Sequence, residues 1–305
     1  MLGRLLPPGS MARRVALTVG ILAATLVFTQ FVLPGGRASA PRGTPVAVLF
    51  LGLVFGMVNA LTAAGLVLVY RTTRVINWSQ TAIGAMGALL CFDFVLYTPV
   101  PFPIAFFLGL ALAGLTGLVF ELVLVRRFFK APRLVLTVVT VLAGGAIAQL
   151  SPNVGKLPFF PKLDTLSITE SRGLTDLTTR LPFAGFSFHV GSLDIPFHFA
   201  HIFAIEASIV ALLGLAAFFR FTKAGVGVRA LAENAERASL LGMSVGVLSM
   251  TVWVIAGVLS GVSVSATGFL SRPANATGFA PGVLLIALAA AVIGRMRSLP
   301  VTVMA

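Results

Sequence analysis

The sequence predicts an all-α protein, a polytopic bundle of about eight transmembrane helices. Hydrophobic residues make up 58% of the 305 residues, and charged residues make up only 10%. A soluble domain carries about 25% charged residues, because it covers a large surface with polar groups. The apolar residues also form long unbroken runs, whereas membrane barrels show short alternating segments. The composition therefore excludes a soluble enzyme, a disordered chain and a coiled coil.

Eight apolar runs approach the roughly 20 residues that a membrane-crossing helix needs. In chain order they are Val15–Leu33, Val46–Tyr70, Thr81–Val100, Ile104–Val125, Leu134–Leu150, His201–Phe219, Val247–Leu270 and Gly282–Gly294. The last run fits a short tilted span, a re-entrant element or the start of a longer helix. The first run fits either a retained anchor or a cleaved secretory signal. We divide the chain into an N-terminal anchor segment (1–45) and a main transmembrane domain (46–305).

The positive charges predict the orientation of the bundle. With the N-terminus in the cytoplasm, 15 of the 22 Lys and Arg residues lie in inner segments, as the positive-inside rule requires. The inner segments are 1–14, 71–80, 126–133, 220–246 and 295–305. We therefore expect a multi-pass protein of a bacterial inner membrane, and we assign the net charge of +13 to topology rather than to nucleic-acid binding.

The longest polar segment, residues 151–200, is predicted to lie outside. Within it, Phe183–Phe199 alternates apolar and polar residues as a short hairpin does. A loop of this length is usually functional. It fits a surface that touches an external partner and equally a packed cap with no partner.

Three acidic residues fall in apolar runs: Asp93, Glu121 and Glu206. Ionisable groups in a membrane are costly and mark functional sites by default. Glu121 lies near Arg126, so we predict an ion pair there. Asp93 is the deepest and is a candidate for the pathway. The three acids are isolated, which disfavours a proton-driven carrier.

Small residues predict close helix contacts. Gly56, Ala60 and Ala64 recur at every fourth position, and Gly257 and Gly261 form a second such pair. This spacing lets helix backbones approach closely in lipid. It predicts a packed bundle and carries no information about a substrate.

The chain contains no motif for catalysis. It has no G-x-x-x-x-G-K-[ST] phosphate loop, no H-E-x-x-H and no G-x-S-x-G. The single cysteine, Cys91, excludes an internal disulfide and a cysteine-based zinc site. His198 and His201 are spaced to share a metal ion, but the sequence offers no third ligand. We expect no catalytic residue, no metal and no enzyme activity.

The longest inner loop, Phe219–Val245, reads as a short amphipathic helix. Glu233 and Arg237 are spaced as a helical ion pair, alanines and a leucine supply an apolar side, and Gly242 is a common helix terminator. The pattern fits a docking site for a soluble partner and equally a solvated connector.

This loop resembles the cytoplasmic coupling loop of the branched-chain amino acid ABC transporter permease family. The residues that carry the resemblance are Thr222, Gly225, Arg229, Ala230, Ala232, Asn234, Ala238 and Gly242. Glu233 begins a Glu-Asn-Ala run where Glu-Ala-Ala is usual. Ile76, Asn77 and Gln80 match a second family motif, in which Thr81 replaces a glycine associated with a helix break. The family pattern begins near the second span and continues beyond Pro300, so a truncated or split permease is left open.

The resemblance implies a permease that does no chemistry itself. ATP-binding cassette subunits would use the ATP and dock on the loop at Thr222, Gly225, Arg229, Ala230, Glu233, Asn234, Ala238 and Gly242. A second permease and an external substrate-binding protein would complete the importer. Asn59, Asn77, Gln80 and Asp93 are the candidates for the translocation pathway, although the amides fit interhelical hydrogen bonds as well.

The nature of the solute is left open. Branched-chain amino acids are expected from the resemblance, while urea or amides, sugars and nucleosides are carried by related systems. The rivals from other classes are a secondary carrier that works without ATP, an intramembrane enzyme and a nonfunctional remnant.

Overall fold

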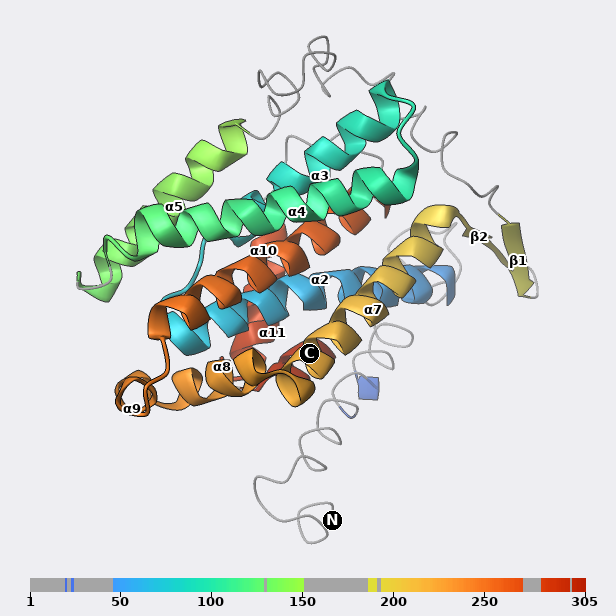
Figure 1. The fold of residues 1–305 in the computed structure, drawn as a ribbon. Helices are drawn as coiled ribbons and strands as arrows, with labels where there is room; N and C mark the ends of the chain where they lie inside the picture. Colours follow the sequence, from blue (N-terminus) through green and yellow to red (C-terminus); the bar gives the residue numbers. More distant parts are fainter. Residues whose placement is uncertain are drawn as a thin grey trace, which may run out of the picture.

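The computed structural model describes residues 46–128, 131–150, 186–190, 193–270, 281–296 and 298–305, together with Gly20, Ala23 and Ala24. Its elements, shown in Figure 1, are α2 (Val46–Thr73), α3 (Gln80–Tyr97), α4 (Phe102–Phe120), the π-helical turn η2 (Glu121–Val125), α5 (Arg133–Leu150), β1 (Phe186–Val190), β2 (Leu193–Phe197), α7 (Phe199–Phe221), α8 (Lys223–Glu233), α9 (Ala235–Leu240), α10 (Val245–Leu270), α11 (Pro281–Ile293) and α12 (Leu299–Met304).

The predicted helical membrane bundle is confirmed. Seven of the eight predicted spans are helices, and their ends lie within three residues of the prediction. In the described part of the chain, five helices are long and apolar enough to cross a membrane: α2, α4 with η2, α5, α7 and α10. Helices α3 and α11 are shorter but equally apolar in character. The predicted span Val15–Leu33 lies outside the described residues, except for Gly20, Ala23 and Ala24.

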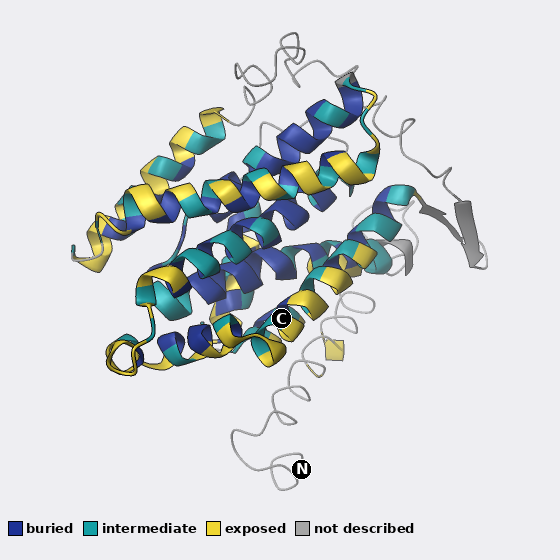
Figure 2. Cartoon of the chain, viewed as in Figure 1, coloured by how far each residue is buried: buried dark blue, intermediate teal, exposed yellow. Residues whose placement is uncertain are grey.

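Helix α10 forms the centre of the bundle, where it packs against α2, α3 and α4. Figure 2 shows that α2, α3 and α10 are the most buried helices. The predicted close contact at Gly257 is confirmed, because a Cβ atom there would lie 2.5 Å from the carbonyl oxygen of Ala113 in α4. The prediction for Gly56 is wrong: this glycine is exposed, and no atom lies within 4 Å of its Cβ position. Ala60 and Ala64 are buried.

Helix α3 runs beside α10 in the same direction but starts deeper in the bundle. Gln80, the first residue of α3, donates a hydrogen bond to the carbonyl of Ala256. Four residues later, Gly84 approaches so closely that a Cβ atom would lie 2.5 Å from the carbonyl carbon of Ser260. Ala256 is eleven residues into α10, which is about 16 Å at 1.5 Å per residue. Helix α3 therefore begins well inside the bundle.

The segment before α3 doubles back into the bundle to reach this starting point. A Cβ atom on Gly65 of α2 would lie 2.6 Å from Nε2 of Gln80, yet α2 continues for eight more residues, to Thr73. Arg74, with φ of 59°, turns the chain in the left-handed region. Residues 74–79, which we call the re-entrant segment, then return to the level of Gly65. Val75, Asn77 and Ser79 of this segment are buried.

The two ends of the bundle differ. Strands β1 and β2 form an antiparallel hairpin with Phe186 opposite Phe197, as predicted for the long polar loop, and the hairpin lies at the end opposite α8 and α9 (Figure 1). At the other end, Arg74 donates a hydrogen bond to the carbonyl of Ala232 in α8, and Arg126 donates one to the carbonyl of Gly246 at the start of α10. The inner segments that contain these two arginines, predicted at 71–80 and 126–133, therefore lie at the same end of the molecule.

The short apolar run near the C-terminus is a helix of 13 residues, α11. Arg295 and Met296 have φ of 53° and 54°, so the chain reverses there. Helix α12 follows and packs against α2. Thr302 of α12 is buried and lies against Gly294. The run is therefore not the start of a longer helix, and a short tilted span and a re-entrant element both remain compatible with it.

Candidate functional site

The re-entrant segment carries a buried polar network at the start of α3. Asn77 Nδ2 donates to Gln80 Oε1 over 2.9 Å. Asn77 Oδ1 accepts from the backbone N–H of Ser79 at 3.1 Å and from its hydroxyl at 2.5 Å. Gln80 Nε2 in turn donates to the carbonyl of Ala256 at 2.9 Å. The structure thus brings two of the predicted pathway residues, Asn77 and Gln80, into one network.

Neighbouring helices complete this network. The hydroxyl of Ser260 in α10 donates to the carbonyl of Gln80 at 2.6 Å. Thr140 of α5 accepts from the backbone N–H of Trp78 at 3.4 Å, and Gly144 places the α5 backbone against Ser79. Buried polar groups are costly unless they are bonded, so these contacts fix the position of the re-entrant segment. The bond from Gln80 to Ala256 is an interhelical hydrogen bond, the alternative role considered for the amides, whereas Asn77 bonds locally to Ser79 and Gln80.

The other two pathway candidates lie elsewhere. Asn59 is half-buried on α2. Asp93 is buried, and its Oδ1 atom has no hydrogen-bond partner among the described residues. It lies thirteen residues beyond Gln80 on α3, about 20 Å away along the helix. The structure therefore does not gather the four candidates into one site, and their role in transport stays a prediction.

The loop between α7 and α10 begins with a tight corner. The hydroxyl of Thr222 accepts the backbone N–H of Gly225 at 2.9 Å, which caps the first turn of α8. Gly225 is buried against the backbone of Phe218, where a side chain has no room. Val228 and Leu231 face inward and join the central apolar core. These residues set the direction in which α8 leaves the membrane helix.

The predicted single helix is wrong, because the chain breaks at Asn234. This residue has φ of −154° and ψ of 110°, and it both ends α8 and caps α9 by accepting the N–H of Arg237 at 3.0 Å. The break removes the helical spacing between Glu233 and Arg237, which form no ion pair in the described part of the chain. Asparagine competes with the helix backbone through its own side chain, which explains the break.

The predicted end of the helix at Gly242 is confirmed. Gly242 has φ of 79°, a conformation that favours glycine. Its N–H bonds to the carbonyl of Ser239, and the N–H of Met243 bonds to the carbonyl of Ala238. This pair of bonds is the Schellman motif that closes many helices. Ala238 is buried beneath it.

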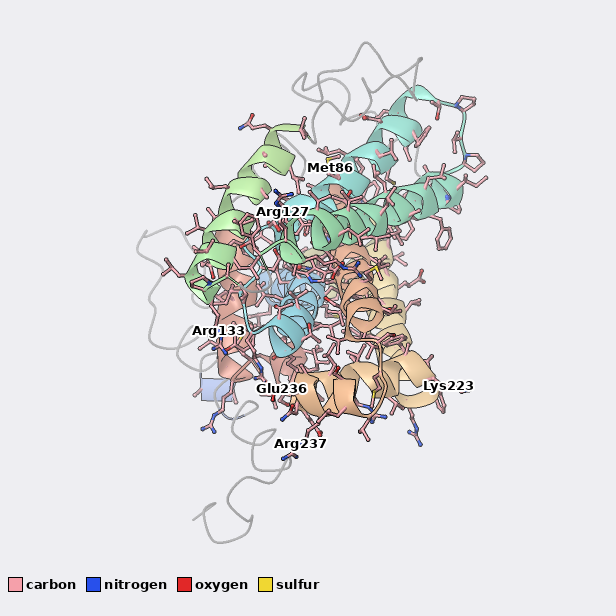
Figure 3. All side chains as sticks on the ribbon, turned by 60° about the vertical axis from the view of Figure 1, so that its left-hand side comes forward. Met86, Arg127, Arg133, Lys223, Glu236 and Arg237 are labelled. Atoms are coloured by element: carbon pink, nitrogen blue, oxygen red, sulfur yellow. The ribbon has the colours of Figure 1, made fainter. Side chains whose placement is uncertain are left out.

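The face of α8 and α9 that points away from the bundle carries charged residues and exposed leucines. Arg229 and Glu233 are exposed, and Ala230 is half-buried. Leu240 and Leu241, at the end of α9, are 87% and 75% exposed. Figure 3 shows that Lys223, Glu236 and Arg237 project from this end away from the bundle. We call the surface formed by Arg229, Glu233, Glu236, Arg237, Leu240 and Leu241 the coupling surface.

Of the predicted loop residues, Arg229 and Glu233 lie on this surface, whereas Gly225 and Ala238 are buried. Thr222, Asn234 and Gly242 are exposed, and they cap or end the two helices. Leu241 is the leucine of the predicted apolar side of the helix, and it is exposed. The sequence does contain a signal for these exposed leucines, because Leu240 and Leu241 stand directly before a glycine that ends the helix. Residues at such an end no longer follow the helical period, so an apolar residue there need not face the core.

The end of α4 contacts the start of α10. The predicted ion pair is confirmed: Nε of Arg126 lies 3.3 Å from Oε2 of Glu121. Glu121 is buried and begins the π-helical turn η2. Arg126 also donates to the carbonyl of Gly246 at 3.4 Å. The pair thus ties the inner end of α4 to the start of α10.

The two histidines have a local structural role. His198 caps α7 and accepts the N–H of His201, while Nδ1 of His201 accepts the N–H of His198 at 3.2 Å. This reciprocal arrangement is a capping box. In the described ranges, no three His, Cys, Asp or Glu side chains group as a metal site would require.

Comparison with known proteins places the chain in a family. A family model described as "Branched-chain amino acid transport system / permease component" matches residues 48–305. The chain is also 24% identical, over 251 residues, to a protein of Methanocaldococcus jannaschii named as a probable branched-chain amino acid transport permease protein LivH. That similarity covers 80% of this chain and 72% of the relative. No solved structure matches the chain.

The matched region includes every described helix from α3 to α12 and nearly all of α2. The family match and the helical membrane bundle agree with one another, and both agree with the resemblance carried by the loop. The chain belongs to the family of branched-chain amino acid transport system permease components.

Proposed function

We propose that the chain is the membrane-spanning subunit of an ATP-driven importer for branched-chain or related amino acids. The observation that carries this proposal is the coupling surface. Beneath this surface, Val228 and Leu231 of α8 pack into the apolar core of the bundle. The surface itself exposes Leu240 and Leu241, at the end of the molecule where the arginine-containing inner connections lie.

The exposed leucines favour docking over a solvated connector. Burial of a leucine side chain contributes about 2 kcal/mol, so a partner that covers both residues gains substantially. The charges around them, Arg229, Glu233, Glu236 and Arg237, are of both signs. Mixed charges at the rim of an apolar patch orient a partner and exclude others. A soluble ATP-binding cassette subunit in the cytoplasm is the partner that we propose.

The remaining parts of the assembly follow from the same proposal. The ATPase subunits bind and hydrolyse ATP, while this chain holds no cofactor and carries out no chemistry. An external binding protein delivers the solute, and a second permease lines the other half of the pathway. The pathway passes the re-entrant segment, with Asn77 and Gln80 positioning the start of α3 and with Asn59 and Asp93 lying elsewhere along it. The chain lies in the inner membrane with its N-terminus in the cytoplasm.

The test is purification of the tagged full chain from its native host in mild detergent, with partners identified by mass spectrometry. The proposal predicts recovery of ATPase subunits and a second permease. Recovery of the chain alone would contradict it. Uptake of radiolabelled leucine into cells with depleted ATP distinguishes the importer from the rival secondary carrier, because the carrier would still transport leucine. The carrier would also lose transport in the variant Asp93→Asn.

A further inference from the structure

Arg74 connects the coupling helix α8 to the re-entrant segment. Its Nη2 atom donates a hydrogen bond of 3.0 Å to the carbonyl of Ala232, across 158 positions of the chain. Ala232 is the second-last residue of α8. The last carbonyls of a helix have no partner within the helix, and cationic side chains favour this end because of the helix dipole. The bond is therefore well placed to hold α8.

A second arginine supports the same contact. Arg71, one helical turn before Arg74 on α2, interacts electrostatically with Glu233 at the end of α8. The hydrogen bond of Arg74 thus joins the end of α2 to the last turn of α8, and the attraction between Arg71 and Glu233 acts at the same place. This contact lies one residue from Asn234, where α8 gives way to α9 and the coupling surface continues.

On its own side, Arg74 stands at the hinge of the re-entrant segment. Its φ of 59° makes the turn at the end of α2, and its N–H bonds to the carbonyl of Tyr70 at 2.8 Å. The next residue, Val75, belongs to the apolar core that also contains Val228 and Leu231 of α8. Two residues later, Asn77 begins the network that ends at Gln80 and Ala256.

These contacts form a short physical path from the coupling surface to the middle of the bundle. We infer that Arg74 is a positioning residue, which transmits a displacement of α8 to the start of α3 through its bond to Ala232. This inference rests on the proposed function, because it needs an ATPase that moves α8. The backbone of Arg74 is bonded to Tyr70 and its guanidinium is bonded to Ala232, so this side chain joins the turn after α2 directly to α8.

The decisive variant is Arg74→Asn, because asparagine tolerates a positive φ but does not reach Ala232. Arg74→Lys keeps the charge and a donor. Arg127→Asn, at an exposed arginine in the turn after η2, is the matched control. Each variant is purified as the complex with its ATPase subunits. Hydrogen exchange is then compared between the nucleotide-free state and the state trapped with ATP and vanadate.

In the wild-type complex and in Arg127→Asn, trapping is expected to change exchange both in 223–240 and in 75–80. In Arg74→Asn the change in 223–240 persists and the change in 75–80 is lost, and Arg74→Lys restores part of it. A change in 75–80 that survives in Arg74→Asn, or that is missing from the wild type, would overturn the inference. Failure of the wild-type chain to copurify with an ATPase would instead overturn the proposed function, and the inference with it.

Discussion

Helices α9 and α10 follow one another in the chain, yet they meet their surroundings in opposite ways. Ser260 and Ser263 of α10 are polar and completely buried, with hydroxyls that bond to carbonyls of α3 and α2. Leu240 and Leu241 at the end of α9 are apolar and 87% and 75% exposed. The buried hydroxyls of α10 thus find their partners inside the chain, whereas the described residues leave the apolar end of α9 uncovered, as the proposed docking requires.

The largest effect is expected where α10 meets α3. Gly84→Leu would place a Cβ atom 2.5 Å from the backbone of Ser260, and backbone cannot move aside as a flexible side chain can. Overpacking a tight contact costs about 1–3 kcal/mol or more, so we expect most of the variant to aggregate on purification. Size-exclusion chromatography in detergent measures this. Gly145→Leu on α5 is the control, because its Cβ position has no atom within 4 Å; equal losses from both would contradict the account.

The next effect concerns the exposed leucines. Leu240→Ala together with Leu241→Ala is expected to weaken copurification of the ATPase by more than tenfold, since each buried leucine contributes about 2 kcal/mol and about 1.4 kcal/mol changes an affinity tenfold. The thermal stability of the bundle should stay unchanged. The matched control is another pair of exposed apolar residues, Leu285→Ala with Ile286→Ala on α11. A similar loss with the α11 pair would show that the effect is not specific to α9.

A moderate effect is expected in the buried polar network. Gln80→Leu removes the bond to Ala256 and leaves Asn77 Nδ2 without its partner. An unsatisfied buried donor costs about 1–3 kcal/mol, so the melting temperature in detergent should fall by several degrees. Thr267→Val is the control, because its hydroxyl bonds only to the carbonyl of Ser263 in its own helix. A melting temperature equal to that of the wild type would argue against a structural role for Gln80.

The smallest effect is expected at the end of α9. Gly242→Ala forces an alanine to adopt φ of 79°, which costs about 1 kcal/mol. The cost falls on a surface loop, so the bundle should keep its melting temperature. Hydrogen exchange in residues 235–243 should become faster, with Gly242→Asn intermediate. Unchanged exchange in Gly242→Ala would show that the Schellman motif does not hold the leucines in place.

Much of the bundle could be predicted from the sequence, because unbroken apolar runs are the strongest signal that a chain can carry. The ends of α2, α3, α5, α7, α10, α11 and of α4 with η2 followed from where those runs stop. The pair Glu121–Arg126 followed from an acidic residue that lies close to a basic membrane boundary. The hairpin of β1 and β2 followed from alternation. In each case the sequence pattern lies within a short stretch of the chain, so it can be recognised without knowledge of the fold.

The parts that could not be predicted depend on contacts between distant residues. Residues 74–79 read as an ordinary polar connection, and only the bond from Gln80 to Ala256 reveals that they re-enter the bundle. The break at Asn234 overrides a helical pattern of charges, because the asparagine side chain caps the next helix. The bond from Arg74 to Ala232 joins residues that no spacing rule connects.

The central claim is that the exposed end of α9 contacts an ATPase. Its most direct test places a photo-crosslinking amino acid at position 240 of the full chain in its native host, and for comparison at position 285, on the exposed face of α11. After irradiation, the account predicts a covalent product with an ATP-binding cassette subunit from position 240 and none from position 285. A full-length chain that yields no ATPase product from position 240, or the same product from both positions, would contradict it.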